Sequence, residues 1–140
     1  MSPFATFLHD LRMSRGIRQS DLAELVGYER SYIAALEASI KGPPTNEFVG
    51  KLISALSLSK PEEQLLLQAL MASERKLVLD PQSSQEIYWL LADLRQQLPN
   101  LHPAQIKIMR DIIAMQGSLA TQVHESDWRI RRRTKEETPM

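Results

Sequence analysis

The sequence of 140 residues contains no cysteine. This absence excludes a disulfide framework, a zinc site with thiolate ligands and a cysteine nucleophile. Long apolar runs are also missing, since no stretch approaches the roughly 18 residues that a membrane span needs. The first residues, MSPFATFLHDLR, lack the basic and then apolar build of a secretory signal peptide. We therefore expect a cytoplasmic protein with no membrane partner.

Features of catalytic and metal sites are scarce as well. The three histidines, His9, His102 and His124, lie far apart in the sequence and lack metal-ligand spacing. There is no glycine-rich phosphate loop, and no stretch shows the sustained alternation of a β-strand. An α/β enzyme fold would have no sheet to build on. We therefore expect an all-α protein with no enzymatic activity, no metal and no cofactor.

The charge of the chain is balanced overall but unevenly distributed. There are 17 Lys and Arg residues and 17 Asp and Glu residues. Residues 1–60 carry seven basic and six acidic residues, residues 61–128 five and nine, and residues 129–140 five and two. A neutral chain of this kind is compatible with a nucleic-acid binder that makes few phosphate contacts, and it predicts modest non-specific affinity.

Helical patterns fill the first 60 residues. Ser2 followed by Pro3 is a typical helix start, Gly27 a typical turn, and Thr45 a typical N-cap. Apolar residues recur at helical spacing in the stretches between these signals. We predict a four-helix domain over residues 1–58, with helices at about 3–14, 19–26, 30–38 and 46–56.

The second and third of these helices are short and joined by a tight glycine turn. Such a pair crosses at a steep angle, so the third helix lies across the second and exposes its outer face to solvent. This arrangement suits insertion of the third helix into a DNA major groove about 12 Å wide. The small Ala23 lies where the helices must cross, and Ile33 and Leu36 anchor the third helix. This detail favours a helix-turn-helix over an ordinary helical hairpin inside a bundle.

The stretch resembles the helix-turn-helix of phage-repressor and Cro-type regulators, the Xre family. The family pattern of Gln, small Ala, Gly, buried Ile and Leu-Glu is matched by Gln19, Ala23, Gly27, Ile33 and Leu36-Glu37. The likeness extends over roughly residues 4–58. It implies a sequence-specific transcriptional regulator that binds double-stranded DNA. One such helix contacts only a few base pairs, too few to single out a genomic site, so we expect a dimeric repressor that binds an inverted-repeat operator.

The resemblance also implies roles for single residues. The base-reading residues would be Glu29, Arg30, Ser31 and Ala35. An arginine bonds guanine O6 and N7 in a bidentate manner, so we expect a G·C pair in each half-site, whereas Ala35 can touch only a thymine methyl. The phosphate contacts would be Arg18, Gln19, Tyr32 and Lys41, and Gln19 would also brace the third helix.

For the phosphate residues a plainer alternative stays open, namely solvated basic and amide side chains and a tyrosine packed at the domain surface. Arg12 and Glu37 are expected to form a structural pair between the first and third helices rather than to read DNA. Removing one partner of such a buried pair strands the charge of the other.

Residues 59–126 are predicted to form a helical dimerisation or interaction region. Ser59 with Glu62 and Ser83 with Glu86 are capping-box signatures of two helices, and His102 with Pro103 starts a third. The last two helices are predicted to form an antiparallel hairpin. Their apolar surface is larger than two helices can bury against each other. The predicted dimer-interface residues are Ile87, Leu90, Leu91, Leu94, Leu98, Ile106, Met109 and Ile113.

Other interpretations of this region stay open. Its helices could fold back on the first domain as the core of a monomer. They could instead sequester a partner protein, as in an antitoxin or adaptor that uses DNA binding for autoregulation. A small-molecule pocket lined by Tyr88 and Trp89 is a third hypothesis, although aromatic residues on a leucine-rich helix usually lie in a core or interface. Residues 127–140 are expected to be a basic flexible tail.

Overall fold

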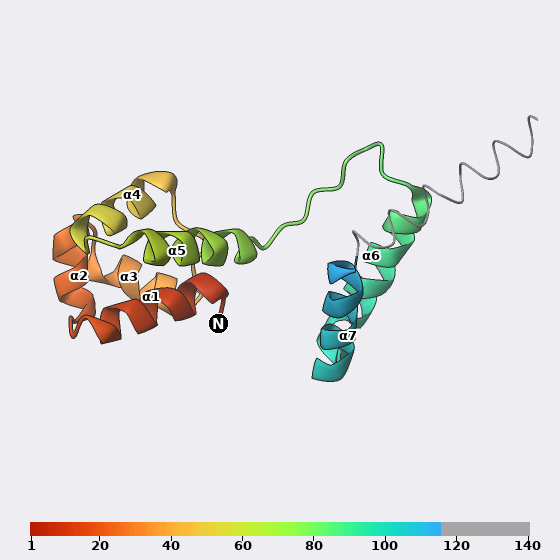
Figure 1. Cartoon of the computed structure of the whole chain (residues 1–140), viewed down its shortest axis with the longest axis horizontal. Coiled ribbons are helices and arrows are strands. Elements are labelled where there is room, and N and C mark those ends of the chain that lie inside the picture. Colours follow the sequence, from red (N-terminus) through yellow and green to blue (C-terminus); the bar gives the residue numbers. More distant parts are fainter. Residues whose placement is uncertain (116–140) are drawn as a thin grey trace, which may run out of the picture. The chain divides into compact units, whose positions relative to one another are not determined.

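The computed structural model describes residues 1–115, which form seven α-helices and one short 3-10 helix and contain no strand. The predicted all-α class is confirmed. The chain divides into two compact units, Met1–Leu79 and a second unit that begins at Asp80. Figure 1 shows α1 to α5 in the first unit and α6 and α7 in the second. The predicted tail and His124 lie outside the described residues.

The first unit contains five helices whose starts follow from local capping. The Ser2 hydroxyl accepts from the backbone N–H of Ala5, and that of Thr45 from Phe48. Gly27 ends the second helix with a φ of 73°, in the left-handed region. The helices are α1 (Pro3–Ser14), α2 (Gln19–Val26), α3 (Arg30–Glu37), α4 (Asn46–Ala55) and α5 (Lys60–Ala72).

The core of this unit receives side chains from all five helices. Fully buried residues include Phe4, Leu22, Ile33 and Phe48, one from each of the first four helices, and Leu66 from α5. Their apolar spacing along each helix directs one face inward. The core therefore fixes α3 between its neighbours and leaves the opposite face of α3 toward solvent.

The position of α5 differs from the prediction. The expected domain boundary at residue 58 would separate α5 from the first domain, but Leu66 of α5 is 0% exposed and α5 packs on α1. The Ser59–Glu62 capping box is present, and Glu62 also pairs with Arg15 at the end of α1. The first unit is thus a five-helix domain that extends to Leu79.

The second unit begins with α6 (Gln85–Gln97), continues through the 3-10 helix η1 (Leu98–Asn100) and reaches α7 (Pro103–Ala114). The cap of α6 is Ser84 rather than the predicted Ser83, because the Ser84 hydroxyl accepts from the Ile87 N–H. His102 caps α7 as predicted and forms a capping box with Gln105. Within the described residues, no helix is long and apolar enough to cross a membrane.

Candidate nucleic-acid interface

The helix-turn-helix consists of α2, the turn at Gly27 and α3. Ala23 and Val26 of α2 and Ile33 of α3 are buried, so the two helices pack through small and branched side chains. The outward face of α3 begins with Arg30 and Ser31, which are both exposed. The predicted base-reading residues at the start of α3 are therefore accessible to a partner.

The other two predicted base-reading residues lie differently. Glu29 is the N-cap of α3 but its side chain makes no capping bond; its Oε2 accepts instead from the Ser31 hydroxyl at 3.4 Å. Ala35 is half-buried. The polar groups available for base contacts are therefore concentrated in the first turn of α3.

Three predicted DNA-contact residues from two helices meet in one surface pocket. Arg18 and Gln19, at the start of α2, and Arg30, at the start of α3, line it together with Arg12 and Ser20. Within residues 1–115, neither Arg18 nor Arg30 pairs with a carboxylate. Two arginine side chains, at the amino ends of α2 and α3, thus line the same pocket, where both could approach one anionic ligand.

Gln19 occupies the predicted bracing position. Its Nε2 donates to Glu37 Oε2 over 2.9 Å, which joins the start of α2 to the end of α3. A side-chain amide carries two N–H donors, so the second one can still serve a phosphate oxygen. The phosphate contact of Gln19 stays a prediction.

Arg12 and Glu37 form a two-pronged ion pair between α1 and α3. Arg12 Nε lies 2.6 Å from Glu37 Oε1, and its second terminal nitrogen, Nη2, lies 3.2 Å from Oε2. Arg12 also donates to the carbonyl oxygen of Ile17 over 2.9 Å. The two side chains are 12% and 6% exposed. Glu37 therefore holds α1 and α2 to the last turn of α3.

The protonation of Glu37 follows from these contacts. Burial alone would raise the pKa of Glu37, but hydrogen bonds from Arg12 and Gln19, together with the positive charge of Arg12, outweigh it and lower that pKa. The hydrogen bond to Glu37 in turn raises the pKa of Arg12. Both groups are therefore charged at neutral pH, as a structural ion pair requires.

Tyr32 and Lys41 belong to an aromatic cluster that sequence reasoning missed. The rings of Tyr28 and Tyr32 stack at 5.2 Å, and both meet the buried ring of Phe48 edge-on. Lys41 Nζ lies 5.2 Å from the centre of the Tyr32 ring, a cation–π distance. Burial, with a smaller contribution from Tyr28, raises the pKa of Tyr32, so its hydroxyl stays protonated.

Tyr32 is thus a packing residue, and the phosphate contacts of Tyr32 and Lys41 stay predictions. No helical spacing in the sequence predicts the cluster, because Tyr28 lies in the turn between α2 and α3 whereas Tyr32 lies within α3.

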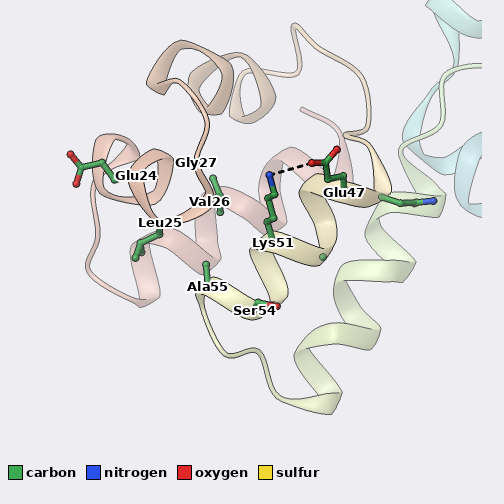
Figure 2. A pocket seen from close by; sticks show the side chains of 10 residues that line it. Glu24, Leu25, Val26, Gly27, Glu47, Lys51, Ser54 and Ala55 are labelled. Carbon is green, nitrogen blue, oxygen red and sulfur yellow. Dashed lines mark ion pairs between the residues drawn. The ribbon is translucent and has the colours of Figure 1, made fainter.

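A second pocket lies between the end of α2 and α4 (Figure 2). It contains Glu24, Glu47 and Lys51, and Lys51 pairs with Glu47 over 3.2 Å. Its ionisable lining residues therefore carry an excess of negative charge, which disfavours a phosphate. None of the predicted DNA-contact residues lies there. Within residues 1–115, no group of three acidic, histidine or cysteine side chains is placed to hold a metal ion.

The predicted dimer-interface residues lie on α6, η1 and α7. Leu91, Leu94 and Met109 are half-buried, and no residue from Asp80 to Met115 is buried. Leu90 and Ile113 are 62% and 70% exposed. The remaining exposed members of the set are Ile87, Leu98 and Ile106.

The first unit contains a known type of domain. Residues 3–66 match the family model described as a helix-turn-helix domain. No curated protein is significantly similar to the chain. Among solved structures, a chain of a SinR protein/SinI protein complex matches 82% of this chain and 98% of its own length, with 23% sequence identity and a TM-score of 0.40.

Proposed function

Because residues 3–66 form a helix-turn-helix domain, we propose that the chain is a sequence-specific transcriptional regulator of the Xre type that reads double-stranded DNA through the major groove. The observation that carries this proposal is the exposed first turn of α3 beside the amino end of α2, where Arg18, Gln19 and Arg30 line one pocket. The role is binding rather than catalysis, and we place the protein in the cytoplasm with the DNA that it binds.

Within this proposal, α3 enters the groove with its amino end first. Arg30 bonds a guanine in a bidentate manner, and Ser31 adds a weaker base contact. Arg18 and Gln19 hold phosphates of the flanking backbone, and Lys41 holds a phosphate from the loop after α3. Half-buried Ala35 leaves the later part of α3 with little polar discrimination.

Two alanine variants test this division of roles on an operator selected from random DNA. Arg30→Ala is expected to cost about 1–3 kcal/mol of binding and to relax the preference for the G·C pair. Lys41→Ala is expected to weaken binding to all sequences alike and to flatten the salt dependence by about one. Unchanged affinity and preference in Arg30→Ala would show that α3 does not read the bases.

We also propose that the protein acts as a dimeric repressor through its second unit. One helix-turn-helix contacts only a few base pairs, too few to single out one genomic site, so two copies must be held in register. The apolar residues of α6 and α7 that stay exposed, such as Leu90 and Ile113, suit burial against a second copy. A two-fold dimer would place its α3 helices about 34 Å apart on an inverted repeat.

Sedimentation of the full-length protein tests the dimer. The wild type is expected to sediment as a dimer at micromolar concentration, and the double variant Leu90→Glu and Ile113→Glu as a monomer with weaker operator binding. Leu77→Glu is the matched control, because Leu77 is exposed outside α6 and α7. A monomeric wild type would overturn the dimer.

The exposed apolar residues of α6 and α7 also favour a second candidate function, an antitoxin or adaptor that sequesters a partner protein. In that case the wild type would be monomeric alone and would bind DNA mainly to regulate its own gene. A toxin-like reading frame beside the gene would favour this candidate.

A further inference from the structure

One buried polar side chain lies outside the proposed DNA-binding surface. Ser73, directly after α5, is 6% exposed. Its hydroxyl oxygen accepts from the backbone N–H of Phe4 over 2.8 Å and donates to the carbonyl of Ala69 over 2.6 Å. The first N–H groups of a helix have no acceptor within the helix. The Ser73 hydroxyl is the acceptor for one of these groups in α1, the N–H of Phe4, although the two residues lie 69 positions apart in the sequence.

A second set of contacts converges on Ser39, directly after the C-cap of α3. Its φ of 60° lies in the left-handed region, which lets the N–H of Ile40 turn back to the carbonyl of Ala35 over 3.0 Å. The Ser39 hydroxyl accepts from the backbone N–H of Ser2 over 2.9 Å. The Ser39 carbonyl accepts from the guanidinium of Arg75. The turn that ends α3 is thus held by the start of α1 and by the chain after α5.

These contacts form one connected clip, which we define as Ser2, Ser39, Ser73 and Arg75. Ser73 fixes the first turn of α1, whose neighbour Ser2 contacts Ser39, while Arg75 contacts Ser39 directly. The clip joins elements separated by 36 to 69 residues along the chain. Two of its members, Ser73 and Arg75, lie beyond residue 66, where the helix-turn-helix match ends.

We propose that Ser73 and Arg75 are positioning residues for α3, so that the working DNA-binding domain includes the residues after α5. This inference rests on the proposed function, because it concerns the same α3 surface. Base reading by Arg30 requires a nearly linear hydrogen bond within about 0.3 Å of its best length. A turn held at Ser39 fixes the carboxyl end of α3 and thereby the direction in which its amino end enters the groove.

The test compares Arg75→Gln with Lys76→Gln in the full-length protein. Both variants remove one positive charge from neighbouring exposed residues, but of these two residues Arg75 is the one that donates to the Ser39 carbonyl. Arg75→Gln is expected to lower operator affinity about threefold to tenfold, the fold-change that corresponds to one lost hydrogen bond. Its salt dependence should stay that of the wild type, because no phosphate contact is lost. Lys76→Gln should change neither quantity beyond the small effect of its charge.

Amide hydrogen exchange without DNA provides a readout that does not depend on DNA binding. Faster exchange at Ile40 and Lys41 is expected in Arg75→Gln and not in Lys76→Gln. Both N–H groups donate to the Ala35 carbonyl, and these hydrogen bonds depend on the turn at Ser39 that Arg75 holds in place. Ser73→Ala should show the same change and also faster exchange at Phe4, with some loss of thermal stability because Ser73 is buried.

The outcomes separate the possibilities. A salt dependence flattened by about one in Arg75→Gln would show a direct phosphate contact and would overturn the positioning role. Unchanged affinity in Arg75→Gln, whether or not exchange at Ile40 changes, would overturn it as well. A wild-type protein that selects no DNA sequence would overturn the proposed function and this inference with it, whereas sequence-specific binding that ignores Arg75 overturns the inference alone.

Discussion

Replacing Glu37 by alanine removes the acceptor that joins three helices. Glu37 accepts two hydrogen bonds from Arg12 of α1 and one from Gln19 of α2. In Glu37→Ala the Arg12 side chain, which is 12% exposed in the wild type, keeps the Ile17 carbonyl as a partner but has lost its counter-charge. The cost arises mainly from this stranded charge rather than from the lost pair itself.

The magnitude follows from burial. Removing one partner of a buried, hydrogen-bonded ion pair costs about 3–5 kcal/mol, whereas an exposed pair contributes at most about 1 kcal/mol. Because 1 kcal/mol shifts the melting temperature of a domain of this size by about 4–8 °C, Glu37→Ala should melt at least about 10 °C below the wild type.

Circular dichroism melting of the full-length protein measures this change, with Glu24→Ala on the exposed face of α2 as the control. The double variant Arg12→Leu and Glu37→Leu should recover much of the loss, because it buries no unpaired charge. A decrease below about 2 °C in Glu37→Ala would refute the reasoning, since it would mean that the pair behaves as an exposed one.

Three further predictions concern the fold. Because the pKa of Glu37 in the folded protein is lowered, its carboxylate stabilises the fold at pH values above the ordinary pKa of 4.5, and this contribution should be lost as the pH falls from that value through the lowered pKa. Urea titrations at about pH 6 and pH 3 should therefore show a shrinking stability difference between the wild type and Glu37→Gln. Leu66→Ala should destabilise the first unit by about 2–5 kcal/mol, measured by urea unfolding, and a change below about 1 kcal/mol would separate α5 from that core. Ser84→Ala should reduce the stability of α6 by about 1 kcal/mol, measured by its helical signal, while an equal effect of Ser83→Ala would contradict the observed cap.

Local signals in the sequence predicted the helices and the helix-turn-helix. A capping serine or threonine, a proline in the first turn and a left-handed glycine act within a few residues, so Ser2, Gly27 and Thr45 mark helix ends without knowledge of the fold. The spacing of apolar residues likewise identifies the buried face of α3. The two adjacent serines before α6 show the limit of such signals. Ser83 lies three residues before Glu86 and Ser84 three residues before Ile87, so the sequence alone allows either serine to be the N-cap.

Contacts between distant residues could not be predicted in this way. The assignment of α5 to the first unit depends on Leu66 meeting a core formed mainly by residues before position 57. The Glu37 acceptor of Gln19 and the Phe4 N–H donor to Ser73 depend on how α1, α2, α3 and α5 pack, which no local spacing encodes. The Xre resemblance implied a bracing role for Gln19, but only the structure identifies Glu37 as its acceptor.

The most direct test of the central claim is selection of random double-stranded DNA by the purified full-length protein, followed by sequencing, in parallel with Arg30→Ala. We expect the wild type to enrich one inverted repeat whose half-sites are centred about 34 Å apart or a multiple of that distance, each with a G·C pair, and Arg30→Ala to lose the preference for that pair. Recovery of no enriched sequence by the wild type, or of the same sequence with the same preference by Arg30→Ala, would contradict the claim that α3 reads DNA.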